Sequence, residues 1–227
     1  MVLGVASVFA IAPILPLNMP IPLSSPDPSP KMATIHNASM RYAGREYLSL
    51  ALIDARNHSL GLIAQMEKVL PELNFAEKFD TESLAEVAPP LWLLGHVGWF
   101  QEWWIGRNTQ RALGESCPAV PMRLASIEPN ADACFDLVQF THQECWRIEL
   151  PEVMALKAYL METLESTLVL LEKTDETDAA LYFFRLALFH EDQMGEQLLV
   201  AAQALGIKMD LSAPASRVVR EIGRAHV

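Results

Sequence analysis

The chain has 227 residues, 51% of them hydrophobic and 20% charged, which excludes a disordered protein and fits one large or two small globular domains. Seventeen lysines and arginines against 28 aspartates and glutamates give a net charge of −11, which disfavours nucleic acid and anionic membranes as partners. The three cysteines (Cys117, Cys134 and Cys145) lack CxxC spacing, which favours reduced thiols and a cytoplasmic location.

Residues 1–40 are expected to lie outside the folded domain, as a disordered or mis-annotated N-terminal extension. The apolar stretch Val2–Leu17 has the length of a secretory signal, but the positive charge that should precede it is missing, since the first cation is Lys31. We therefore favour a gene start placed too early, with Met32 or Met40 as the true initiator, over a working signal peptide.

Four later segments show helical periodicity between proline or glycine boundaries, which predicts four long helices. The expected ranges are 45–70 before Pro71, Pro89 to Gly114, 152–173 after Pro151, and Asp178, as the capping residue, to Leu205 before Gly206. Residues 115–150 are expected to form a long connection with one short helix around Ala131 to Phe140. No segment has a strong strand period, so we predict an all-α fold over residues 41–207, a four-helix bundle with one long crossover connection.

The second segment carries an aromatic stripe that contains a histidine. Trp92, His96, Trp99 and Trp103 follow one another at helical spacing and so share one face. A second histidine, His190, lies in the apolar part of the fourth segment. A buried imidazole needs a partner, and spacing alone favours a hydrogen-bonded core histidine over a metal ligand.

Two acids follow His190 directly, in the run FHEDQMGE that ends at Glu196. Burying Glu191 together with Asp192 would require a cation or a hydrogen-bonded network. Taken singly, Asp192 and Glu196 are more simply interpreted as part of a solvated helix face.

The remaining histidines have weaker claims to a role. His58 lies in a polar patch of the first segment and is expected at the solvated surface. His142 falls in the long connection, where it could orient a loop or approach the mouth of the bundle. His36 precedes the first helix and His226 lies in the C-terminal tail, and neither is assigned a role.

Two motifs resemble a known family. Residues 89–102 (PPLWLLGHVGWFQE) and 184–192 (FRLALFHED) are similar to the DinB-like N-terminal domain of the ergothioneine-type sulfoxide synthases. The likeness is closer to their selenoneine synthase relatives. It spans about Tyr42 to Gly206, and it is the pair of motifs that makes it specific.

The resemblance implies a non-heme Fe(II) enzyme in which a DinB-like four-helix bundle supplies three histidines. A following domain, similar to the formylglycine-generating enzyme, completes the pocket. With dioxygen, such enzymes join a thiol or selenol to the imidazole of trimethylhistidine. The first ligand falls on His96, and the first histidine of the family's HxxxHxE pair falls on His190. The acid of that motif falls on Glu196, as a hydrogen-bond partner that orients a ligand.

The second histidine of the HxxxHxE pair falls on Met194, and this is a departure from the family. A position one turn after His190 shares its face, but a thioether suits Cu(I) better than Fe(II). Three outcomes stay open: a site completed by Glu191 or another oxygen donor, a weakened site, or a bundle without metal.

The C-terminal tail, residues 208–227, ends in IGRAHV, which resembles the translation of a sequencing adapter at residues 222–227. The chain would then be a fragment that is inactive alone and lacks the second domain. Two alternatives are a free-standing DinB-like metal-dependent thiol transferase or hydrolase, and a non-catalytic helical scaffold. The choice between sulfur and selenium stays open.

Overall fold

The computed structural model describes residues 35, 38–69, 87–118, 120, 122–136 and 138–211. All of them belong to one unit of the chain, Thr34–Val227. Their secondary structure is helical without strands, and one isolated antiparallel bridge joins Asn108 to Arg123. The all-α prediction is therefore confirmed for this part of the chain. The expected signal, a start at Met32 and the adapter fall on residues outside this part of the chain, whereas Met40, the other candidate start, is described.

Four long helices account for most of the described residues: α1 (Arg45–Met66), α3 (Pro90–Gln101), α6 (Val153–Glu172) and α7 (Asp178–Ala204). A short 3-10 helix, η1 (Ala38–Tyr42), precedes α1 and buries Met40. Pro90 begins α3, as expected for a residue that lacks a backbone N–H. None of the described helices combines the length and apolar character that crossing a bilayer requires.

The two ends of α7 follow the expected chemistry with a shift of one residue at the start. Thr177, and not Asp178, is the N-cap, since the Thr177 side chain accepts a hydrogen bond from the N–H of Ala180 at 3.3 Å. Asp178 instead accepts from Arg185 at 2.8 Å. Gly206 follows the helix with a φ of +69°, a conformation that glycine adopts without steric cost.

The second predicted helix is shorter than expected. α3 ends at Gln101 and passes into a π-helical turn, η3 (Glu102–Gly106), and the chain then changes direction before the 3-10 helix η4 (Arg111–Ser116). The side chain of the buried Asn108 accepts from the N–H of Gln110 at 3.0 Å. This local bond competes with the helical pattern, so the prediction of one continuous helix to Gly114 was wrong.

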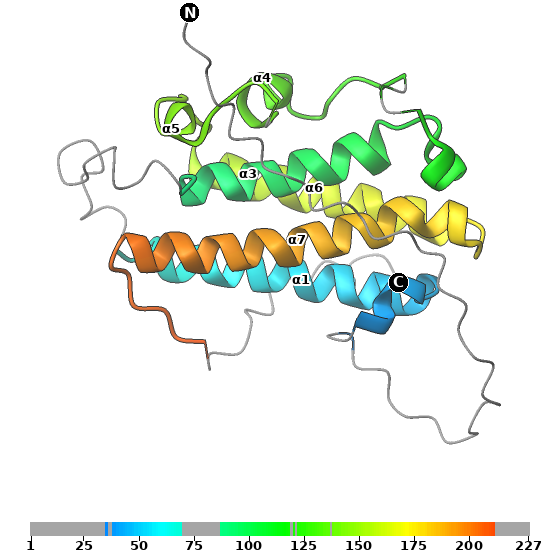
Figure 1. The fold of residues 1–227 in the computed structure, drawn as a ribbon, viewed down its shortest axis with the longest axis horizontal. Coiled ribbons are helices and arrows are strands. Elements are labelled where there is room, and N and C mark those ends of the chain that lie inside the picture. The colour runs from blue at the N-terminus through cyan, green and yellow to red at the C-terminus, as the bar shows by residue number, and fades with distance from the viewer. Residues whose placement is uncertain are drawn as a thin grey trace, which may run out of the picture. The chain divides into compact units, whose positions relative to one another are not determined.

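The long helices bury a common apolar interior. α1 packs against α7, and α3 packs against both α6 and α7 (Figure 1). One apolar cluster contains Trp92, Leu94 and Leu198, and a second contains Leu48 and Phe184. Removing these side chains from water is the main favourable term for folding.

A buried guanidinium joins all four long helices. Arg56 of α1 is fully buried and donates to both oxygens of Glu191 on α7, at 2.8 and 3.1 Å. It also donates to Gln101 of α3 at 2.6 Å and to the carbonyl of Leu160 on α6. We refer to these four residues as the Arg56 network. Every charge in it has a partner, which a buried ion requires.

Besides η3 and η4, the described part of the connection between α3 and α6 contains two short α-helices, α4 (Ala131–Phe135) and α5 (His142–Cys145). Figure 1 shows both on the side of α3, and α4 contacts α3 directly. The helix predicted around Ala131 is thus present over five residues. α5 was not predicted, although the pair Thr141 and Glu144 forms a capping box at its start.

Candidate functional site

The two histidines singled out in the sequence lie together. His96 on α3 and His190 on α7 have ring centroids 5.1 Å apart, with an angle of 60° between the ring planes. His96 is 1% exposed. It continues the predicted aromatic stripe, stacking on Trp92 at 5.0 Å and on Trp99 at 5.4 Å. Phe100 lies parallel to the His190 ring with a centroid distance of 3.6 Å.

The surroundings of His96 define its tautomer and its charge. Its Nδ1 lies 2.8 Å from the carbonyl oxygen of Phe135, and a carbonyl can only accept, so Nδ1 carries the proton. Nε2 is buried and has no hydrogen-bond partner. Burial lowers the pKa of His96 to about 4, against a partial opposing effect of the bond to Phe135, so the ring is neutral at pH 7 and Nε2 presents a lone pair.

The His190 imidazole is likewise held neutral. Burial, with a smaller contribution from His96, lowers its pKa well below the usual value. Neutral imidazole is the form that binds metal ions. Two imidazoles in the protonation state that metal binding requires therefore lie side by side on separate helices.

The other candidate residues on α7 have different surroundings. Glu191 is buried, and both of its oxygens accept from Arg56, so its carboxylate is turned toward α1. Met194 is buried in the same apolar cluster as Trp92. Asp192 and Glu196 are exposed, consistent with a solvated face.

His58 is exposed on α1 and lies beside Gly195, where a Cβ added to the glycine would come within 3.6 Å of the imidazole Cδ2. The expected surface position is therefore observed. The His142 side chain, His36 and His226 lie outside the described residues. Cys117, Cys134 and Cys145 form no disulfide.

A third ligand of the usual kind is not found beside the imidazole pair. Within the described ranges, no three side chains of histidine, cysteine, aspartate or glutamate form a group that could hold a metal ion. The structure thus brings His96 and His190 together and directs the carboxylate of Glu191 to another partner.

Three functional candidates were missed in the sequence. Arg107 and Asp132 form a bidentate ion pair, with N–O distances of 2.6 and 2.8 Å, at the edge of the aromatic stripe. The guanidinium of Arg123 lies 4.5 Å from the Trp103 ring and 4.9 Å from the Trp104 ring, and its buried nitrogens have no hydrogen-bond acceptor. All three charged residues lie in or next to the long connection, whose conformation has no sequence period.

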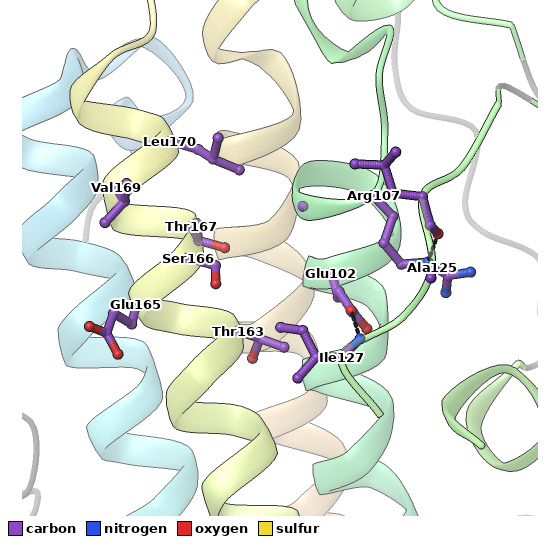
Figure 2. A pocket seen from close by; sticks show the side chains of 12 residues that line it. Glu102, Arg107, Ala125, Ile127, Thr163, Glu165, Ser166, Thr167, Val169 and Leu170 are labelled. Atoms are coloured by element: carbon purple, nitrogen blue, oxygen red, sulfur yellow. Dashed lines mark hydrogen bonds between the residues drawn. The ribbon is translucent and has the colours of Figure 1, made fainter. Parts of the chain in front are cut away.

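A pocket of about 470 Å³ lies between α6 and the η3 turn (Figure 2). Its lining includes Glu102, Arg107, Thr163 and Thr167. Glu102 is already satisfied, since it accepts from Ser126, from the N–H of Ile127 and from the hydroxyl of Tyr159. Neither histidine of the pair lines this pocket, so it is separate from the candidate site.

Replacement of Gly95 by alanine is expected to destabilise the protein by about 1–3 kcal/mol, through overpacking. A Cβ at this position would lie 2.2 Å from a carbon of the fully buried Phe135 ring. Urea denaturation measures the effect. Gly106→Ala is the control, because its Cβ would meet only Glu102 at 3.6 Å, an ordinary contact. Equal stability of the two variants would contradict the close packing of Phe135 on α3.

The chain matches no protein-family model and no curated protein. The geometry of the imidazole pair and the motifs that surround it therefore carry the functional argument alone.

Proposed function

We propose that the four long helices form a DinB-like four-helix bundle in which residues 107–152 are the crossover connection. The all-helical structure, the contacts of α1 with α7 and of α3 with α6, and the length of the α3–α6 connection support this topology. On this proposal the bundle is the metal-binding domain of a non-heme iron oxygenase similar to the ergothioneine and selenoneine synthases.

The observation that carries the proposal is the separation of the two imidazoles. A ring that binds an ion at about 2.1 Å has its centre about 3.2 Å from that ion. If the angle between the two nitrogen–ion directions is about 90–110°, the centres of two such rings lie about 4.5–5.2 Å apart. The separation of 5.1 Å between His96 and His190 falls in this range.

The residues present fit a metal through two nitrogen ligands. The unpartnered Nε2 of His96 is a buried lone pair that an ion would satisfy, and such orphaned groups are rare in folded proteins. Fe(II) held there would supply the activation of dioxygen for joining a thiol or selenol to trimethylhistidine. The chain's own contribution is to orient His96 through Phe135, to hold the His190 ring against Phe100 and to keep water from the His96 ring.

Met194 is proposed to weaken this site. It lies one turn after His190 and is buried, so it occupies the place where the resemblance implies a third histidine. Thioether sulfur is a poor ligand for Fe(II), and Glu191 is engaged by Arg56. The remaining coordination positions would then be left to water or substrate.

A second candidate function, a non-catalytic helical scaffold, is favoured by the surroundings of Glu191 and Met194. The Arg56 network satisfies Glu191 without an ion, and the side chain of Met194 contributes apolar surface to the core. In a scaffold the imidazole pair would be a remnant within a stable helical domain. Metal binding separates this candidate from the first.

Anaerobic titration of the 227-residue chain with Fe(II) tests the proposal. We expect binding by the wild-type chain and loss of binding in His96→Ala. Met194→His should tighten binding at least about tenfold, because it adds an imidazole on the face of His190.

His58→Ala is the matched control, since it removes an exposed histidine of α1 and should leave the affinity unchanged. Absence of Fe(II) binding in both the wild-type chain and Met194→His, with cooperative unfolding retained, would reject the metal site and favour the scaffold.

A further inference from the structure

Three ring N–H groups of the aromatic stripe donate hydrogen bonds to three different residues of α4. Trp92 donates to the carbonyl of Cys134 at 2.8 Å, and His96 donates from Nδ1 to the carbonyl of Phe135 at 2.8 Å. Trp99 donates to the carboxylate of Asp132 at 2.7 Å. The short helix α4 therefore supplies one acceptor for each of three successive rings on α3.

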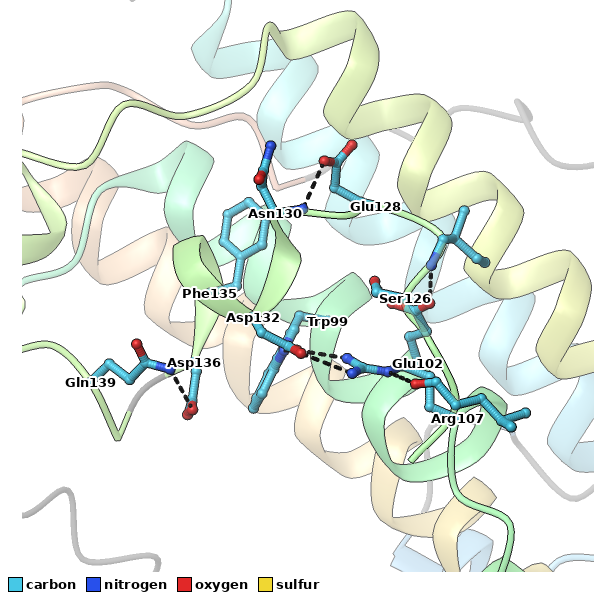
Figure 3. Close-up of polar contacts among 12 residues, drawn as sticks. Trp99, Glu102, Arg107, Ser126, Glu128, Asn130, Asp132, Phe135, Asp136 and Gln139 are labelled. Carbon is cyan, nitrogen blue, oxygen red and sulfur yellow. Dashed lines mark hydrogen bonds and ion pairs between the residues drawn. The ribbon is translucent and has the colours of Figure 1, made fainter. Parts of the chain in front are cut away.

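α4 has only five residues and cannot be stable without tertiary contacts. Its position is fixed from the far end of the η3 turn by Arg107, which grips both oxygens of Asp132 and donates to the carbonyl of Leu124 at 2.8 Å (Figure 3). At the other end of α4, the ring of Phe135 fills the space left by Gly95. We name Arg107, Asp132 and Phe135 the α4 clamp.

We propose that the α4 clamp fixes His96 in the tautomer with the proton on Nδ1, so that the Nε2 lone pair points to the interior as a ligand. The Phe135 carbonyl sets the tautomer directly. Asp132 is a positioning residue, because it touches neither imidazole and acts by holding α4 through Arg107. The part of this inference that concerns metal affinity rests on the proposed function, whereas the tautomer does not.

On this proposal, the role of the long connection is to supply the acceptor that sets the tautomer of His96. Without the acceptor at Phe135, a neutral histidine could place its proton on either nitrogen, and the form with a proton on Nε2 cannot bind an ion through that atom. Partners that orient a metal-binding histidine typically change metal affinity about 10–100-fold when they are removed.

Asp132→Asn is the principal test, because it keeps an oxygen acceptor for Trp99 but removes the charge that Arg107 holds. Long-range ¹⁵N–¹H spectra of the imidazoles in the metal-free chain report the tautomer. We expect His96 to be fully protonated on Nδ1 in the wild-type chain and to become a mixture of tautomers in Asp132→Asn. Fe(II) affinity should fall about 10–100-fold.

Asp178→Asn is the matched control, since it removes another aspartate–arginine pair, with Arg185, far along the sequence on α7. It should change neither the tautomer nor the affinity. Asp132→Glu, which retains the charge, should restore part of both. If Asp132→Asn does not fold, Trp99→Phe removes one of the three bonds, keeps an aromatic ring and should shift the same imidazole signals.

Two results would overturn the inference. The first is a wild-type His96 that is protonated on Nε2. The second is that Asp132→Asn and Trp99→Phe both keep the Nδ1–H tautomer of His96 and both bind the metal with an affinity within twofold of wild type. Failure of the proposed function has a different signature. In that case the wild-type chain shows the Nδ1–H tautomer, and the variants lose it, but none of the proteins binds Fe(II).

Discussion

Replacement of Arg56 by methionine is expected to lower the free energy of unfolding by about 3–5 kcal/mol, the usual cost of breaking a buried ion pair from one side. Glu191 would be left 2% exposed with neither of its oxygens accepting from a cation. Gln101 and the carbonyl of Leu160 would lose the same donor. Urea denaturation at pH 7, with the slope compared between variants, measures the loss.

A double variant separates the charge from the packing. Arg56→Met combined with Glu191→Met removes both ions and replaces them with apolar side chains of similar length, so most of the lost stability should return. A single variant that loses less than about 1 kcal/mol would show that the network contributes little, contrary to its burial and geometry.

Acidification from pH 7 to pH 5 is expected to cost about 2 kcal/mol of stability through His96 alone in the metal-free chain, and about 3 kcal/mol over the whole titration. Burial lowers the pKa of His96 from 6.5 in the unfolded chain to about 4 in the folded protein. Between these two pH values His96 is protonated in the unfolded chain but neutral in the folded protein. The free energy of unfolding is therefore highest above pH 6.5 and decreases as the pH falls toward 4. His190 adds a loss in the same direction.

Urea midpoints at several pH values, in the presence of a chelator, measure this slope. His96→Gln should flatten the curve between pH 7 and pH 5, whereas His58→Gln, at an exposed position, should keep the wild-type slope. Arg107 lowers the pKa of Asp132 below its usual 3.8, so the stability from that pair is lost only at pH values beneath the histidine window. A wild-type curve that is flat from pH 7 to pH 5 would contradict the buried, neutral imidazoles.

The helices and the aromatic stripe were predictable because they follow from periodicity. Trp92, His96, Trp99 and Trp103 share a face at a spacing that any helix imposes, and the structure shows them as a continuous stack. For Glu191 only a condition could be stated from the sequence, that its burial together with Asp192 would require a cation or a network. Glu191 alone is buried, and the cation that pairs with it, Arg56, was not identified.

Arg56 escaped prediction because its neighbours Asn57 and His58 suggested a polar surface. Its position in the sequence could have indicated burial, because Arg56 lies four residues after Leu52 and four before Leu60, on the buried face of α1. The α4 clamp gave no comparable signal. Its members are brought together by the π-helical turn and by an irregular loop, and neither has a period that could be counted.

The Arg56 network has a consequence for helix register. If one of its helices shifted by one turn, about 5.4 Å, the buried guanidinium of Arg56 would lose the acceptor on that helix. An unpaired buried charge costs free energy that a mismatch of apolar side chains alone would not. Glu191 directly follows His190, and Gln101 lies five positions beyond His96. Through Glu191 on α7 and Gln101 on α3, the buried Arg56 network thus fixes the relative register of the two helices that carry the imidazoles, and alternative registers of these helices cost free energy.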